Sequence, residues 1–204
     1  MSDNHPVDKS RRRFLVAGSS VVGGAGTAVA AWPFVASMNP SAHARAVGAP
    51  VEISLDKLEP GQMMRDQWRG KPVWIVRRSK AMLKTLDGLK DKLRDPDSAV
   101  SEQPADARNE YRSIKPEYLV LVGVCTHLGC SPTFRPDVAP EDLGDKWEGG
   151  FFCACHGSRF DLAGRVFKHV PASKNLEVPP YRFADGNKIV IGELDQDDDA
   201  KGSA

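Results

Sequence analysis

All four cysteines of the chain lie in two short stretches, Cys125-Thr126-His127-Leu128-Gly129-Cys130 and Cys153-Ala154-Cys155-His156-Gly157-Ser158. Thiolate and imidazole are the side chains that bind iron and zinc in proteins. Each stretch contains a cysteine and a histidine close together, as Cys125-x-His127 and Cys153-x-x-His156. A tight turn in each stretch would present this Cys/His pair to a common centre. The two stretches therefore predict the two halves of one metal site.

Cys130 and Cys155 are then left over, one in each stretch. These two thiols are placed to form a disulfide that would clamp the two loops around the site. Such a bond persists only in an oxidising compartment.

Three kinds of site compete for these six residues. A zinc site needs four ligands, but zinc ribbons usually carry two Cys-x-x-Cys knuckles, which this sequence lacks. A purely structural disulfide would leave the matched placement of His127 and His156 unexplained. The third possibility is a [2Fe-2S] cluster with two cysteines on one iron and two histidines on the other.

The two stretches resemble the iron–sulfur protein of the cytochrome bc1 complex, the Rieske family. The resemblance is strong over residues 118–193 and continues through Phe160-Asp161, Gly164-Arg165-Val166, Pro171-Ala172, Asn175-Leu176 and Pro179-Pro180-Tyr181. It implies an all-β fold, in which an antiparallel β-sandwich base carries an inserted cluster-binding subdomain, at about residues 122–182. One N-terminal transmembrane helix would precede this domain.

The resemblance also implies roles for the residues of the site. Cys125, His127, Cys153 and His156 would bind the cluster, and Cys130 and Cys155 would form the disulfide. Four further residues would lie around the cluster: Gly157, Ser158, Phe160 and Pro171. The Ser158 hydroxyl would bond a bridging sulfide, and Pro171 would belong to a third loop that shields the cluster. Phe160 departs from the tyrosine of many high-potential members, and the loop around Pro171 departs from the usual Gly-Pro-Ala-Pro run.

The implied function is electron transfer from ubiquinol to cytochrome c1 within a dimeric complex. Replacing two thiolates by neutral imidazoles removes negative charge from the cluster and raises its reduction potential, which suits a quinol donor. By family analogy His156 would accept the quinol hydrogen bond, and Leu128 and Gly129 would form the tip that docks onto cytochrome b. Alternatives are the Rieske subunit of an exported arsenite oxidase and, less compatible with the extra cysteines and the N-terminus, a ferredoxin or oxygenase component.

The N-terminus predicts export and anchoring. Ser10-Arg11-Arg12-Arg13-Phe14-Leu15 resembles a twin-arginine signal, with Arg11 and Arg12 as its pair, and opens an uncharged stretch over residues 14–38. As a helix this stretch would span about 37 Å, against a hydrocarbon core of about 30 Å. Basic residues before it place residues 1–13 in the cytoplasm and the main domain, residues 51–204, in the periplasm of a bacterial inner membrane. A basic run that only orients the anchor is the alternative.

Residues 39–50 lack apolar periodicity and predict a flexible tether. Within them, Ala42-His43-Ala44 resembles a signal-peptidase site, so cleavage stays open beside an uncleaved anchor. After Arg45 the chain carries 23 basic and 25 acidic residues, with an acidic tail at Asp195 and Asp197–Asp199. This near-neutral balance gives no indication of nucleic-acid binding.

The remaining pattern is mainly β. Short runs rich in β-branched and aromatic residues predict strands at residues 51–55, 72–76, 118–124, 150–152, 182–184 and 188–191. One amphipathic helix is expected over Ser79 to Leu93, with its leucines in the core. Residues 95–116 are expected to be loop with at most a short helical turn, and His169 is expected to be a solvated loop residue.

Overall fold

The structure is a computed structural model that describes residues 8–194. The chain divides into two compact units, residues 1–46 and 47–204, which are described here one at a time. The acidic tail predicted at residues 195–199 lies outside the described residues.

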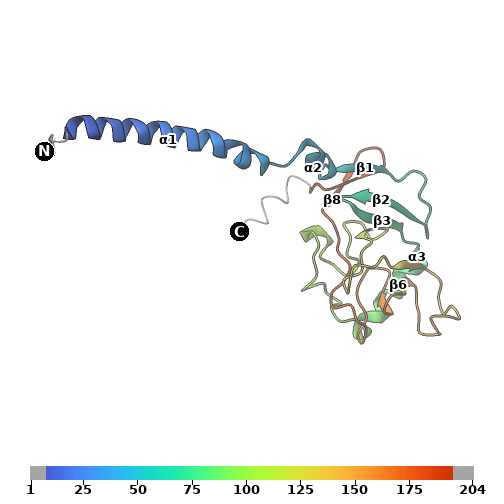
Figure 1. Ribbon diagram of the computed structural model, residues 1–204. Coiled ribbons are helices and arrows are strands. Elements are labelled where there is room, and N and C mark those ends of the chain that lie inside the picture. The colour runs from blue at the N-terminus through green and yellow to red at the C-terminus, as the bar shows by residue number, and fades with distance from the viewer. Residues whose placement is uncertain (1–7, 195–204) are drawn as a thin grey trace. The chain divides into compact units, whose positions relative to one another are not determined.

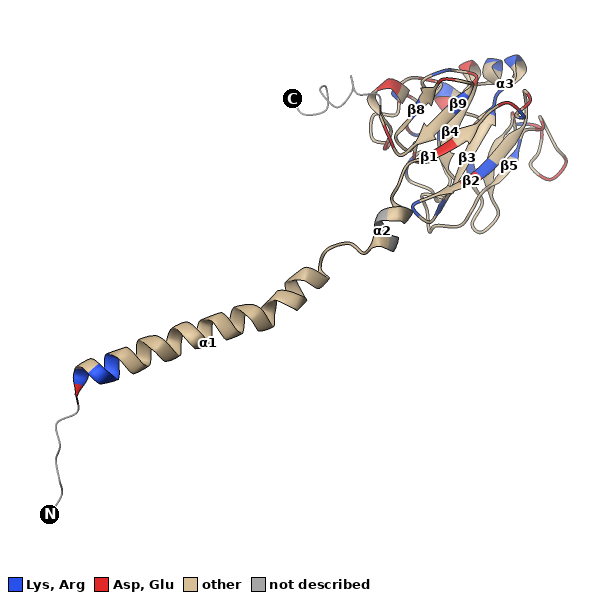
Figure 2. Cartoon of the chain, turned by 90° about the horizontal axis from the view of Figure 1, so that it is seen from above, with Lys and Arg blue, Asp and Glu red and all other residues tan. Residues whose placement is uncertain are grey.

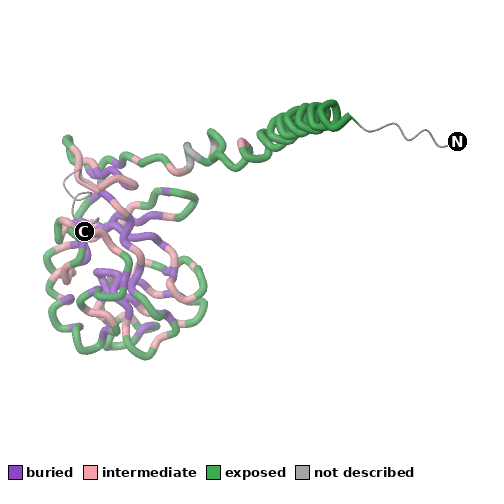
Figure 3. The backbone as a smooth tube through the Cα atoms, turned by 90° about the vertical axis from the view of Figure 1, so that its left-hand side faces the viewer, coloured by how far each residue is buried: buried purple, intermediate pink, exposed green. Residues whose placement is uncertain are grey.

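The first unit is built on one long helix, α1 (Lys9–Ser37). The Asp8 carboxylate caps it by accepting hydrogen bonds from the backbone N–H groups of Ser10 and Arg11. None of its residues is buried, and its basic residues gather at its N-terminal end (Figures 2 and 3). Its 29 residues extend for about 43 Å, and it is long and apolar enough to cross a membrane.

The segment predicted as a tether contains a six-residue helix, α2 (Ala42–Val47). This helix was not predicted from the sequence, although its three alanines are strong helix formers. Whether the segment acts as a tether stays a prediction.

Among the described residues of the second unit, the strands form three antiparallel sheets of three strands each. Figure 1 labels several of these strands. The first sheet has the order β1-β9-β8 and the second β2-β3-β4. The third, with the order β5-β6-β7, carries the cysteine-containing loops. The strands are β1 (Val51–Ser54), β2 (Met63–Trp68), β3 (Lys71–Arg77), β4 (Tyr118–Val122), β5 (Thr133–Arg135), β6 (Gly150–Cys153), β7 (Ser158–Phe160), β8 (Tyr181–Ala184) and β9 (Lys188–Ile191).

The first two sheets share one hydrophobic core, as the predicted sandwich base requires. Strands β3 and β4 run through its middle, and every residue of β4 is buried. Cys125 and Cys153 belong to the same buried cluster. The base therefore extends without a break into the floor of the cysteine-containing loops.

The predicted helix over Ser79 to Leu93 was wrong as one continuous element. The α-helix α3 (Lys80–Thr85) ends early, and a 3₁₀ helix, η1 (Asp87–Lys92), follows. Leu83, Leu86 and Leu89 recur at every third residue, a spacing that matches the three residues per turn of a 3₁₀ helix, and Gly88 disfavours an α-helix. The core role of the leucines was confirmed, since Leu86 and Leu89 are each only 1% exposed.

All six predicted strands are present, within about two residues, and the loop at residues 95–116 contains only the short turn η2 (Ala105–Ala107). Strands β2, β5 and β7 were not predicted. β2 contains a run of consecutive exposed polar residues that breaks any alternating pattern, and the other two strands have three residues each, too few for such a pattern.

Candidate metal centre

The first cysteine loop leaves the buried strand β4 and closes as a tight turn. The Gly129 N–H donates to the Cys125 carbonyl (3.0 Å), and the Cys125 N–H donates to the Cys130 carbonyl (2.7 Å). Gly129 has a φ of +84°, which only glycine adopts without strain. At the start of the loop, Gly123 faces the Trp74 ring, with which any Cβ would collide.

The second loop connects β6 to β7 and repeats this construction. The Gly157 N–H donates to the Cys153 carbonyl (2.9 Å), and Gly157 has a φ of +77°. In both loops the glycine is the fourth residue after the first cysteine. The two predicted halves of the site are therefore turns of the same kind.

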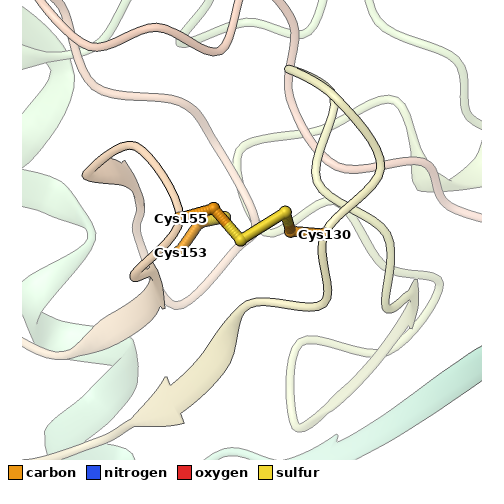
Figure 4. Close-up of side chains that lie close together, drawn as sticks. All are labelled: Cys130, Cys153 and Cys155. Carbon is orange, nitrogen blue, oxygen red and sulfur yellow. A yellow bond between two sulfur atoms is a disulfide. The ribbon is translucent and has the colours of Figure 1, made fainter.

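The four cysteines divide as predicted. Cys130 and Cys155 form the disulfide that joins the two loops, 25 residues apart in the sequence (Figure 4). Cys125 and Cys153 are free and buried, at 4% and 2% exposed. The Cys153 sulfur lies within 4.8 Å of both disulfide sulfurs, so the bond lies close to one of the two free thiols.

Burial, together with a hydrogen bond to Cys125, raises the pKa of the Cys153 thiol. Thiols bind metals as thiolates, so a metal ion must displace this proton when it binds.

The two histidines also meet. The rings of His127 and His156 lie edge to face with their centroids 4.8 Å apart. His127 is half-buried, whereas His156 is exposed. The site thus has a buried sulfur side and a nitrogen side that reaches solvent.

The predicted third loop lies beside both cysteine loops. The Ala172 N–H donates to the Ser158 hydroxyl oxygen (3.1 Å), and the Thr126 hydroxyl donates to the Lys174 carbonyl (2.6 Å). Ser158 is buried and, as an acceptor here, keeps its own proton for another partner. Pro171 itself is exposed.

Phe160 is completely buried at the end of β7, where it pairs with Phe151. His169, expected to be a solvated loop residue, is exposed and has a φ of +59°.

Two residues that hold the third loop, Thr126 and Asn175, were not predicted from the sequence. The buried Asn175 side chain accepts from the Val166 N–H (2.8 Å) and donates to the Asp95 carbonyl (2.9 Å). Asn175 belongs to the matched Asn175-Leu176 pair, but nothing in the sequence alone indicates which backbone groups it contacts.

A buried charged network, also missed, lies behind the second loop. Asp161 forms a fully buried ion pair with Arg165 (2.7 Å) and accepts from the Ala163 N–H (2.9 Å). Arg78 and Arg112 are buried nearby and donate to the carbonyls of residues 162–164. Burial lowers the pKa of both arginines to about 10.

The residues fit a [2Fe-2S] cluster with mixed ligands. Two free buried thiols and two adjoining imidazoles provide four ligands from two matched turns, and the disulfide removes the other two thiols from the ligand set. Two Cys and two His are the ligands of the Rieske type of cluster. The fold and the site together define a Rieske-type iron–sulfur protein.

Comparison with known proteins agrees and is more specific. The model of the Rieske [2Fe-2S] domain matches residues 50–181, and that of the Ubiquitinol-cytochrome C reductase Fe-S subunit TAT signal matches residues 1–41. The ubiquinol-cytochrome c reductase iron-sulfur subunit of Allochromatium vinosum is 60% identical over 92% of this chain and 90% of its own length. That of Blastochloris viridis is 40% identical over 94% and 98%.

Among solved structures, a chain of a hyperthermophilic respiratory Complex III has 28% identity and a TM-score of 0.48, covering 86% of this chain and 99% of its own. On the sequence matches, the chain belongs to the family of ubiquinol-cytochrome c reductase iron-sulfur subunits.

Proposed function

We propose that this chain is the electron-transfer subunit of a ubiquinol–cytochrome c reductase, taking one electron at a time from ubiquinol and passing it to cytochrome c1. Family membership supports the role in the complex, with cytochrome b and cytochrome c1 as partners. The relatives favour it over the arsenite oxidase alternative. The observation that carries the proposal is the pair of matched turns, with buried thiols on one side and imidazoles that reach solvent on the other.

We assign Cys125 and Cys153 to one iron and His127 and His156 to the other. The two thiols are buried whereas His156 is exposed, which supports this division: the sulfur ligands would be shielded and the histidine ligands would face a partner. When bound, the [2Fe-2S] cluster accepts and returns a single electron. The Cys130–Cys155 disulfide holds the two turns together around it.

His156 is the residue that meets the quinol. Its imidazole is exposed, so the ring nitrogen that does not bind iron can accept a hydrogen bond from the quinol hydroxyl and then its proton. His127 is half-buried and less accessible to the substrate. Beside it Leu128 is 71% exposed, which supports an apolar tip formed with Gly129 that docks onto cytochrome b.

The N-terminal unit directs export of the domain and anchors it in the membrane. The twin-arginine signal and the exposed apolar helix α1 fit an exported, membrane-anchored subunit. We propose that the anchor stays in the bacterial inner membrane with Lys9 and the arginines in the cytoplasm, because basic residues favour that side. The main domain is then periplasmic, within a dimeric complex.

The ligand assignment is tested by replacing each histidine in the full complex. We expect His127→Gln and His156→Gln to abolish the electron paramagnetic resonance signal of the reduced cluster and to lower iron and acid-labile sulfide. His169→Gln is the matched control, because this histidine is exposed on the neighbouring third loop and is not a proposed ligand. An unchanged signal in either ligand variant would refute the assignment. Failure of the wild-type chain to co-purify with haems b and c1 would refute its place in the complex.

A further inference from the structure

A groove of about 400 Å³ runs beside the second cysteine loop and has no role in the function described above. Gly157, the residue after His156, forms part of its wall. Its floor includes the paired rings of Trp147 and Phe167, whose centroids lie 6.4 Å apart. Trp147 is buried and its indole N–H donates to the Arg135 carbonyl (3.1 Å), so this floor is fixed in place.

The walls of the groove are basic. Four cationic side chains line it: Lys92, Lys146, Arg159 and Lys168. Lys92 pairs with Glu148 (3.1 Å), and the Lys168 ammonium donates to the Asp91 carbonyl (2.8 Å). Within residues 8–194, Lys146 and Arg159 have neither an ion pair nor a side-chain hydrogen bond.

This charge is a local concentration. The chain after Arg45 has slightly more acidic than basic residues, yet four cations meet here and Glu148 is the one carboxylate that pairs with them among the described residues. A groove lined by one sign of charge attracts surfaces of the opposite sign.

We infer that the groove is the docking surface for an acidic patch on the subunit that receives the electron, cytochrome c1 in the function proposed above, on which this inference rests. A partner that approaches the exposed His156 closely enough to exchange an electron also meets the groove, because the next residue, Gly157, lines the groove. Acidic side chains on that partner would pair with Lys146 and Arg159.

The same end of the domain thus has two unlike surfaces. Leu128 on the first loop is exposed and apolar, which suits a membrane-embedded subunit, whereas the groove beside the second loop is cationic and suits a surface in water. The two partners would then meet different surfaces on either side of the same exposed His156.

The test is the double variant Lys146→Gln/Arg159→Gln in the purified full complex. After laser-flash oxidation of haem c1, the rate of its re-reduction by the iron–sulfur subunit should fall about threefold at low ionic strength, since two exposed ion pairs are lost. The variant and wild-type rates should converge at high ionic strength, because salt screens the wild-type attraction. Lys146→Gln/Lys168→Gln provides a second variant that leaves β7 intact.

The matched control is Lys57→Gln/Arg65→Gln, which removes one lysine and one arginine that are exposed and lie outside the groove. Its rates should equal those of the wild type at every salt concentration. Equal rates in the groove variants would overturn the inference, as would a slower quinol-dependent reduction with an unchanged c1 step.

A lipid partner is distinguished from cytochrome c1 by varying the phospholipid composition of the nanodisc. If replacing the anionic phospholipid of the surrounding nanodisc by phosphatidylcholine reproduces the defect in the wild type, the groove binds headgroups and the inference is wrong. The electron paramagnetic resonance signal of the reduced cluster is recorded in each sample. Its loss in the wild type would instead refute the proposed function.

Discussion

At the scale of single residues, the environment of the cluster site is set by what lies against its sulfur side. Phe160 is completely buried on the strand that pairs with β6, in the core cluster that includes Cys125 and Cys153. A phenylalanine side chain offers the cluster no hydrogen-bond donor. Hydrogen bonds to the sulfur atoms of a cluster stabilise its more negative, reduced state.

Phe160→Tyr should therefore raise the midpoint potential. One added hydrogen bond of about 1 kcal/mol corresponds to about 40 mV for a one-electron couple. Redox titration followed by electron paramagnetic resonance measures the shift. Phe152→Tyr, at a half-buried position on the same hairpin, is the control. A midpoint that stays constant or falls in Phe160→Tyr contradicts the prediction.

Asp161 is the second residue whose role follows from its surroundings. Its carboxylate is fully buried and pairs with Arg165, while Arg78 and Arg112 are buried close by. Removing one partner of a buried pair leaves an uncompensated charge. The lowered pKa values of Arg78 and Arg112, about 10, show that burial already disfavours their charged forms.

Asp161→Asn should lower the free energy of unfolding by about 3 kcal/mol or more, because it keeps the shape of the side chain but removes its charge. Urea denaturation followed by circular dichroism measures it. Asp97→Asn, at an exposed position, should stay within about 0.5 kcal/mol of the wild type. Equal losses in the two variants would mean that the buried charge is not what matters.

At the scale of elements, the site consists of two turns that the disulfide joins. The Cys130–Cys155 bond closes a stretch with a sequence separation of 25, and the third loop is held to both turns through Thr126 and Ser158. A cross-link stabilises mainly by restricting the unfolded chain.

Cys130→Ser/Cys155→Ser should lower the free energy of unfolding by about 3 kcal/mol and speed the loss of the cluster on heating. Urea denaturation followed by circular dichroism measures the free energy of unfolding, and the visible absorbance of the cluster during a thermal ramp measures its loss. Dithiothreitol should destabilise the wild type and leave the double variant unchanged. Equal sensitivity of both proteins to the reductant would show that the disulfide is not the stabilising element.

Sequence patterns predicted the elements that bury a regular apolar run and the site residues that a motif contains. Strands β3, β4 and β9 follow from their β-branched runs, and the disulfide follows from the two cysteines left over. β2 was missed because its consecutive exposed polar residues give no alternating pattern. Contacts between distant segments, such as Asn175 with Asp95, depend on the tertiary fold and leave no local pattern.

At the scale of the whole molecule, the chain combines an exposed apolar helix with a separately folded domain. Export of such a domain after folding depends on the identity of the two arginines in its signal. A basic run that only orients the anchor depends on charge alone.

Arg11→Lys/Arg12→Lys keeps every positive charge and separates these two possibilities. We expect the variant protein to accumulate in the cytoplasm, with residues 51–204 protected from protease added to spheroplasts. Arg13→Lys, one residue further on, is the control and should be exported normally. Normal export of the double variant would favour a role in orientation alone.

The position of the disulfide also has a consequence for how the chain can be followed in a cell. Molecules still in the reducing cytoplasm keep Cys130 and Cys155 as thiols, whereas in molecules that have crossed the membrane both thiols are oxidised to the disulfide. Cys155 is exposed and can be reached by an alkylating reagent. The extent of labelling therefore records on which side each molecule resides, without any tag or antibody.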